Sequence, residues 1–205
     1  MKHLFYSTFV VVAFFARMVE AQILCSDGTY AQNFNMLAST NAFWTNNVTL
    51  PGWYASKAGA DNTNTLAGAG TSITGGIYSF ATNGVNAATD RALGSIASGA
   101  TTPIYYGVRF TNDTGLTLTN LAVSYAGEQW RMGSSATVQK LAFSYLVSSA
   151  PVTNSFSGSG WINFAALDFS SPDATGAAQA LDGNAAINRE TFTNVVLADV
   201  AIRAL

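Results

Sequence analysis

Residues 104–131, IYYGVRFTNDTGLTLTNLAVSYAGEQWR, contain the two most regular strand patterns of the chain. In each arm apolar side chains recur at every second position, which is the period of a strand with one buried face. One face carries Tyr106, Val108 and Phe110 from the first arm, and Leu121, Val123 and Tyr125 from the second. The other face carries Tyr105, Gly107, Arg109 and Thr111, then Ala122, Ser124, Ala126, Glu128 and Trp130. Because the connecting residues 112–115 are Asn, Asp, Thr and Gly, the segment is predicted to be a β-hairpin.

The rest of the chain carries short strand patterns separated by turn residues. We expect strands at 28–37, 75–81, 91–95, 139–148 and 191–202, strand pairs within 38–69 and 161–169, and a helical turn near 177–181 in the polar segment 172–188. No long segment has the period of a helix. This pattern predicts an all-β fold, an antiparallel β-sandwich of the jelly-roll type, with residues 22–205 forming a single domain.

The first 21 residues have the features of a signal peptide. A basic start at Lys2 precedes the apolar run 4–15, and Val19 and Ala21 place small residues at the −3 and −1 positions of a cleavage site. A transmembrane anchor is the alternative, but the run is short for a bilayer. A lipoprotein is disfavoured because no small residue stands directly before Cys25. We therefore expect a secreted protein, extracellular or at the cell surface, with no membrane span after cleavage.

Residue counts restrict the chemistry of the secreted chain. The one histidine, His3, lies in the leader, and Cys25 is the one cysteine. Histidine-based hydrolysis, imidazole-bound zinc and an internal disulfide are thereby excluded, and we expect no metal or other cofactor. Cys25 is expected to be a small apolar residue of the first strand. Beyond the leader, seven cations are spread singly among ten acids, so no basic patch for nucleic acid is expected.

Six segments together resemble a family of secreted bacterial β-sandwich modules, with a match covering about residues 27–195. They read GGIYSF, RALGSIASG, IYYGVRFTNDTG, VSYAGEQWR, ALDFSSP and ALDGNAAINR. Such modules occur in proteins with a C-terminal PEP-CTERM sorting segment, or ahead of an extracellular nuclease of the endonuclease/exonuclease/phosphatase type. The resemblance implies a sandwich fold and no catalytic residues.

The chain departs from that family at its end. Family members continue past the strand matching 191–202 into an LRW-like strand and an acidic GNDHGLAIDD-like stretch, whereas this sequence ends at Arg203, Ala204 and Leu205. We therefore expect an incomplete copy of the module that lacks its closing strands. Any ligand or calcium site in the acidic stretch, and any attached nuclease, would be missing as well.

Glu128, Trp130 and Arg131 form the most chemically suggestive cluster, within the segment EQWR. One interpretation makes Trp130 a stacking platform for a sugar whose hydroxyls bind Glu128 and Arg131. Another makes Glu128 one half of a glycosidase pair; the second carboxylate would be Glu190, Asp168 or Asp182. We favour a structural interpretation, in which Glu128 forms a partly buried ion pair with Arg91, Arg109 or Arg131.

Other aromatic and polar residues also allow either a binding role or a structural role. An aromatic binding face could be built from Trp44, Trp53, Tyr54 and Trp161, although we favour burial in the core. A calcium loop could involve Asp173, Asp182 and Asn184, but turn chemistry explains their spacing better.

The sequence thus predicts a non-catalytic module for adhesion or association with a cell surface or extracellular matrix. Alternatives are a carbohydrate-binding module and a glycosidase-like enzyme using Glu128. The expected partner is extracellular polysaccharide or cell-surface matrix.

Overall fold

The computed structural model describes residues 23–82, 90–133, 137–149, 156, 159–198, 200 and 202. Within them, regular structure consists of β-strands and three single-turn 3-10 helices, Cys25–Asp27, Ala165–Leu167 and Ala186–Asn188. The predicted all-β class is confirmed. No helix in these ranges has the length and hydropathy to cross a membrane. The predicted signal peptide lies outside the described residues.

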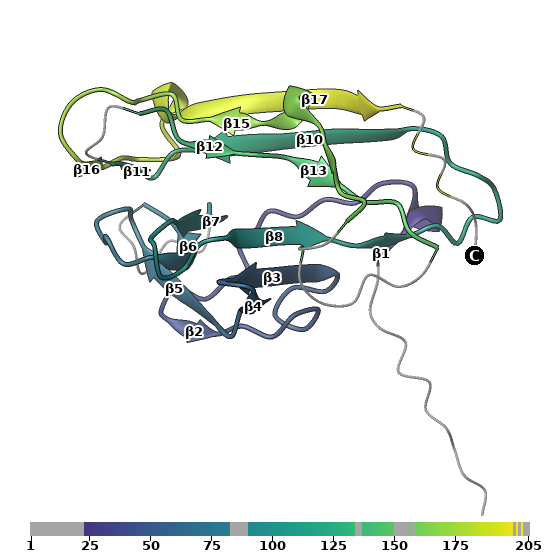
Figure 1. Cartoon of the computed structure of the whole chain (residues 1–205), viewed down its shortest axis with the longest axis horizontal. Coiled ribbons are helices and arrows are strands. Elements are labelled where there is room, and N and C mark those ends of the chain that lie inside the picture. The colour runs from purple at the N-terminus through teal and green to yellow at the C-terminus, as the bar shows by residue number, and fades with distance from the viewer. Residues whose placement is uncertain are drawn as a thin grey trace, which may run out of the picture.

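The first half of the chain builds two small sheets, which form the lower layer in Figure 1. One sheet has the order β2 (Ala42–Phe43), β5 (Asn64–Gly68), β6 (Gly76–Phe80) and β7 (Ala92–Ile96). The other has the order β4 (Ala60–Asp61), β3 (Trp53–Lys57) and β8 (Ile104–Val108). The predicted strands at 75–81 and 91–95 are confirmed as β6 and β7.

The second half of the chain supplies the upper layer of Figure 1. Its longest pair is antiparallel, β10 (Leu121–Glu128) with β17 (Arg189–Leu197). Three short antiparallel pairs accompany it: β11 (Arg131–Met132) with β16 (Gln179–Ala180), β12 (Lys140–Leu141) with β15 (Phe169–Ser170), and β13 (Ser144–Tyr145) with β14 (Ile162–Asn163). Parallel pairing occurs between β1 (Ile23–Leu24) and β9 (Phe110–Thr111), and between β5 and β6. The arrangement is sandwich-like, as predicted.

The predicted hairpin at 104–131 is wrong. Instead of pairing with each other, β8 pairs with β3 along its whole length and β10 pairs with β17. The two arms lie in different layers in Figure 1, so the connecting residues cross from one layer to the other. Asn112 stabilises the crossing by donating from Nδ2 to the carbonyls of Leu116 (2.6 Å) and Ile202 (2.8 Å).

The face assignment of the second arm is correct along most of β10. Leu121, Val123 and Tyr125 pack into a buried cluster around Leu167, whereas Ala122, Ser124 and Ala126 are exposed. Glu128 and Trp130 were assigned to the exposed face, and this is wrong. Both side chains are largely buried, and Trp130 packs on Phe80 of the lower layer and against Gly183, which precedes β17.

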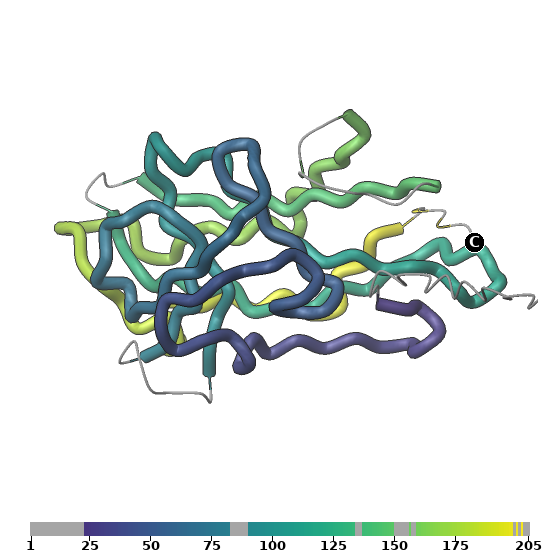
Figure 2. Tube along the Cα trace, turned by 90° about the horizontal axis from the view of Figure 1, so that it is seen from below, coloured from purple at the N-terminus to yellow at the C-terminus, as the bar shows by residue number. Residues whose placement is uncertain are grey.

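Three other predicted elements differ from the structure. The segment 28–37 forms no strand; after β1 the chain, purple in Figure 2, runs along one side of the molecule. The predicted strand 139–148 is split into β12 and β13, because Asp168 accepts a hydrogen bond from the Phe143 amide at the break (2.8 Å). Residues 177–181 contain β16 instead of a helical turn. Cys25 lies in a 3-10 turn just after the first strand.

Strand β6 is the centre of the lower layer, since all five of its residues are buried. Ile77 packs on one face with Trp44, Leu50 and Leu93. On the other face, Tyr78 and Phe80 pack with Trp130. Because a strand alternates its side chains, β6 joins two separate apolar clusters and fixes the position of Trp130 between the layers.

Candidate functional site

Glu128 and Trp130 lie where β10 ends and the chain turns toward β11. Glu128 Oε1 is 3.1 Å from Nη2 of Arg189, the residue opposite it on β17. The Trp130 indole donates to Glu128 Oε2 at 3.0 Å. Only 9% of the Glu128 side chain is exposed. The predicted structural ion pair is confirmed in kind, but its partner is Arg189 and none of the three arginines named from the sequence.

Burial raises the pKa of Glu128, and this effect outweighs the opposing influence of Arg189 and the Trp130 hydrogen bond. The negative charges of Asp90 and Asp182 raise it further. A raised pKa is also a property of general acids. Here, however, both carboxylate oxygens are already bound to protein groups, so the carboxyl serves as an internal contact.

Two of the three carboxylates considered as the second glycosidase residue, Asp182 and Asp168, are bound to other protein groups. Asp182 Oδ1 accepts hydrogen bonds from Thr82 Oγ1 (3.2 Å) and from the Asn184 amide (3.0 Å). Asp168 binds Lys140 Nζ at 3.0 Å in addition to its backbone contact. Glu190 is exposed, one residue beyond the Arg189 that pairs with Glu128.

Trp130 is buried, with 4% of the residue exposed. Its ring stacks on Phe80 (centroids 5.7 Å apart, planes at 6°), and Phe80 stacks on Tyr78 (4.9 Å, 7°). Gly183 packs so closely that an added Cβ would lie 2.4 Å from the indole. The ring is therefore part of the core, and its predicted role as an exposed platform for a sugar is wrong.

Arg131 holds the segment that joins β5 to β6. Its Nη1 donates to the carbonyl oxygens of Gly70 (3.0 Å) and Thr71 (3.4 Å). Gly70 has a φ of 79°, and a Cβ there would lie 1.7 Å from the Trp130 carbonyl oxygen. The backbone of the 70–74 segment is thus fixed directly against residues 130 and 131.

The proposed calcium ligands are engaged in turns. Asp173 exchanges two hydrogen bonds with the buried Gln129, and its Oδ1 accepts from the Thr175 amide at 3.0 Å. Asp182 caps its own turn as described above. Within the described ranges no group of three or more His, Cys, Asp or Glu side chains is placed to hold a metal. The turn interpretation of these residues is confirmed.

The aromatic residues considered for a binding face are separated in the structure. Trp44 is 3% exposed in the core. Trp53 packs edge-to-face on Phe34 and donates from Nε1 to the Tyr30 hydroxyl at 2.7 Å. Trp161 packs on Phe156, with ring centroids 5.7 Å apart. Burial is confirmed for Trp44 and in part for Trp53.

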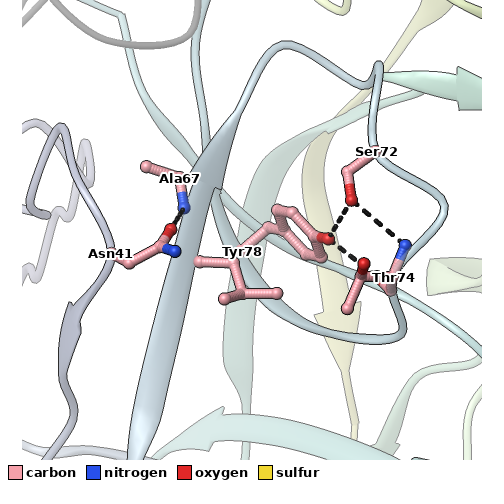
Figure 3. A pocket seen from close by; sticks show the side chains of 6 residues that line it. Asn41, Ala67, Ser72, Thr74 and Tyr78 are labelled. Carbon is pink, nitrogen blue, oxygen red and sulfur yellow. Dashed lines mark hydrogen bonds between the residues drawn. The ribbon is translucent and has the colours of Figure 1, made fainter.

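The stacked rings of Trp130, Phe80 and Tyr78 form an aromatic row. A small open pocket lies beside Tyr78, at the end of the row away from Trp130 (Figure 3). Its volume is about 300 Å³, and its lining consists of Asn41, Leu66, Ala67, Ser72, Thr74 and Tyr78. The Tyr78 hydroxyl lies 2.7 Å from the Thr74 carbonyl oxygen and 2.9 Å from Ser72 Oγ. Ser72 Oγ also accepts from the Thr74 amide at 3.1 Å. The pocket wall is therefore a hydrogen-bonded loop anchored on a buried tyrosine.

None of these lining residues was identified from the sequence. Ser72 and Thr74 stand in an ordinary polar segment. Asn41 comes from the residue just before β2, more than thirty positions before Tyr78. Alternation could have shown that Tyr78 and Phe80 share a face of a strand. The structure then relates the predicted cluster to the pocket, because Trp130 ends the aromatic row and Arg131 fixes the pocket loop.

Comparisons with protein-family models, with curated proteins and with solved structures give no match for this chain. The resemblance to secreted bacterial modules accordingly stays a prediction.

Proposed function

We propose that this protein is a secreted, non-catalytic β-sandwich module that attaches to an extracellular surface or matrix. Export by the leader 1–21 and jelly-roll connectivity are parts of this proposal. The observation that carries it is the engagement of Glu128, whose two carboxylate oxygens bind Arg189 and Trp130 inside the protein. A binding role needs no free acid, whereas a glycosidase requires two available carboxyl groups.

Carbohydrate binding is the second candidate function, and the pocket beside Tyr78 favours it. Its polar lining consists of hydroxyl and amide groups, and none of the described side chains that line it is charged. A rigid concave site with a few placed polar groups is the usual form of a small-ligand site. If the protein binds carbohydrate, the pocket is then the sugar-binding site in place of Glu128, Trp130 and Arg131, which the sequence suggested.

A glycosidase-like activity of Glu128 is the third candidate, and the geometry supports it least. The raised pKa of Glu128 is its one favourable observation. For catalysis the Arg189 ion pair and the Trp130 hydrogen bond would both have to be released, leaving a buried indole N–H without a partner.

A sedimentation experiment tests the main proposal. The purified protein is mixed with insoluble bacterial cell walls, chitin, cellulose and xylan, and the bound fraction is measured beside serum albumin. Release of reducing ends from soluble forms of the same polysaccharides is measured in parallel, with Glu128→Gln as the comparison. We expect saturable binding to at least one matrix, equal for both variants, and no release of reducing ends. Absence of binding to every matrix would contradict the proposal, as would hydrolysis that Glu128→Gln abolishes.

A further inference from the structure

We infer that the pocket beside Tyr78 binds one uncharged sugar residue, such as the terminal residue of a polysaccharide chain. This inference rests on the proposed surface-binding function and names its ligand class and its site. The size, the polarity and the rigidity of the pocket support it.

Size limits the ligand. Pockets for small molecules range from about 300 to 1,000 Å³, and this one, at about 300 Å³, is at the lower end. That volume suits a single ring with its hydroxyl groups. A longer segment of polysaccharide would extend beyond the lining residues.

The polar groups of the pocket are arranged for a ligand rich in hydroxyls. Asn41 Oδ1 accepts from the Ala67 amide at 2.9 Å, which fixes the orientation of the side-chain amide (Figure 3). Within the described residues, its Nδ2 and the Thr74 hydroxyl make no hydrogen bond, so donors and an acceptor are available to a ligand. Leu66, which is half-buried, adds apolar surface. Sugars present both hydroxyls and C–H groups, and so match both kinds of surface.

Charge disfavours acidic ligands. Among the residues that the structure describes, none that lines the pocket is a lysine or an arginine, although carboxylates and phosphates are usually bound by such cations. Arg131, which contacts the pocket loop, directs Nη1 to the carbonyls of Gly70 and Thr71. A uronic acid or a phosphorylated sugar would therefore lose its hydration without gaining an ionic partner.

Rigidity favours a preformed site. Tyr78 is 1% exposed and stacks on Phe80. Its hydroxyl and Arg131 hold the pocket loop from two sides. A site whose groups are already ordered loses less entropy on binding, which matters for a ligand of a single ring.

The experiment uses four probes, the methyl glycosides of glucose, galactose, mannose and N-acetylglucosamine, with glucuronic acid as the charged comparison. Binding to the full chain is measured by ligand-observed NMR. Thr74→Val removes a hydroxyl at an exposed position without breaking an internal side-chain bond. Asn41→Leu removes the amide. Thr191→Val and Asn163→Leu are matched controls on exposed positions of the upper layer, and thermal melts verify folding of every variant.

We expect at least one methyl glycoside to bind more tightly than glucuronic acid. Each pocket variant should weaken its binding at least fivefold, and both controls should bind like the wild type. Failure of all four glycosides to bind would overturn the inference, as would unchanged binding in folded pocket variants. Matrix sedimentation distinguishes failure of this inference from failure of the proposed function. If the protein sediments with a matrix but its pocket binds no sugar, only the inference is wrong. If it sediments with no matrix, the proposed function is wrong as well.

Discussion

The indole nitrogen of Trp130 donates a 3.0 Å hydrogen bond to Oε2 of Glu128, two residues earlier in the chain. This bond joins two parts of the molecule, because Glu128 is paired with Arg189 across β10 and β17 while Trp130 stacks on Phe80 of β6. The Glu128 carboxylate therefore connects the Arg189 ion pair to the tryptophan that packs on the lower layer. Replacing that carboxylate should affect stability more than any binding activity.

Glu128→Ala should destabilise the fold, and Glu128→Gln should not. Alanine leaves the buried Trp130 N–H without an acceptor, which costs about 1–3 kcal/mol. Glutamine retains an acceptor oxygen and leaves only the partly exposed Arg189 without its ion pair, so we expect its stability within about 1 kcal/mol of the wild type. Chemical denaturation of the three proteins at pH 7 measures the differences. Equal losses for both substitutions would show that the charge, and not the hydrogen bond, is what stabilises this contact.

The effect of Glu128→Gln should depend on pH. Burial raises the pKa of Glu128 above the ordinary value of about 4.3, so the folded state binds the proton more tightly than the unfolded state. The stability associated with this proton is fully present below the ordinary pKa and is lost as pH rises through the folded pKa. The variant should therefore gain stability relative to the wild type between pH 4 and neutral pH.

Taking the difference between the two proteins removes the contribution of other acids. Hydrogen bonds from the Phe143 amide and Lys140 lower the pKa of Asp168, and those from Ser26 lower the pKa of Asp113. These two groups act in the opposite sense, with stability that is lost as pH falls. A difference that is flat with pH, or that reverses sign, would contradict the raised pKa of Glu128.

Gly70→Ala should be far more destabilising than Gly59→Ala. Both glycines have a positive φ, 79° and 81°, so alanine is strained at either by about 1–2 kcal/mol. At position 70 the new Cβ would also meet the Trp130 carbonyl oxygen at 1.7 Å, whereas nothing lies within 4 Å at position 59. Thermal melts should show a small decrease for Gly59→Ala and a loss of folding, or of several kcal/mol, for Gly70→Ala. Similar melts would show that the 70–74 segment can move away from Trp130.

Val123→Asp should unfold or strongly destabilise the upper layer, while its neighbour Ala122→Asp should be tolerated. Val123 is half-buried against the cluster around Leu167, so an aspartate there places an unpaired carboxylate against apolar side chains and costs several kcal/mol. Ala122 is exposed on the opposite face of β10. Circular dichroism melts of the two variants measure the contrast, and equally mild effects would contradict the assignment of faces on this strand.

Local pattern was sufficient for strands whose burial is regular. The alternation of Leu121, Val123 and Tyr125 correctly indicated the buried face of β10, and the apolar segment 75–81 correctly predicted β6. It failed at 139–148, where the bond from the Phe143 amide to Asp168 interrupts the strand. The two residues are twenty-five positions apart, and the spacing of apolar residues does not predict their contact.

The candidate site was only partly predictable for the same reason. The sequence marked Glu128, Trp130 and Arg131 as unusual, and they do share one region of the structure. Their roles depend on Arg189, Phe80 and Gly70, which are distant along the chain. The pocket combines Asn41 with Tyr78, two residues that no motif connects.

The sequence by itself determined the all-β class, because a period of two and frequent turn residues permit strands and disfavour helices. It also determined that histidine-based chemistry has no residue beyond His3, because His3 is the one histidine of the chain. Only the tertiary structure decided the pairing of strands. The Asn112 turn is compatible with a hairpin, but β3 and β17 occupy the edges of β8 and β10 along most of their lengths. Each strand can pair with any strand edge that buries its apolar side chains, so the observed pairing depends on packing across the whole molecule.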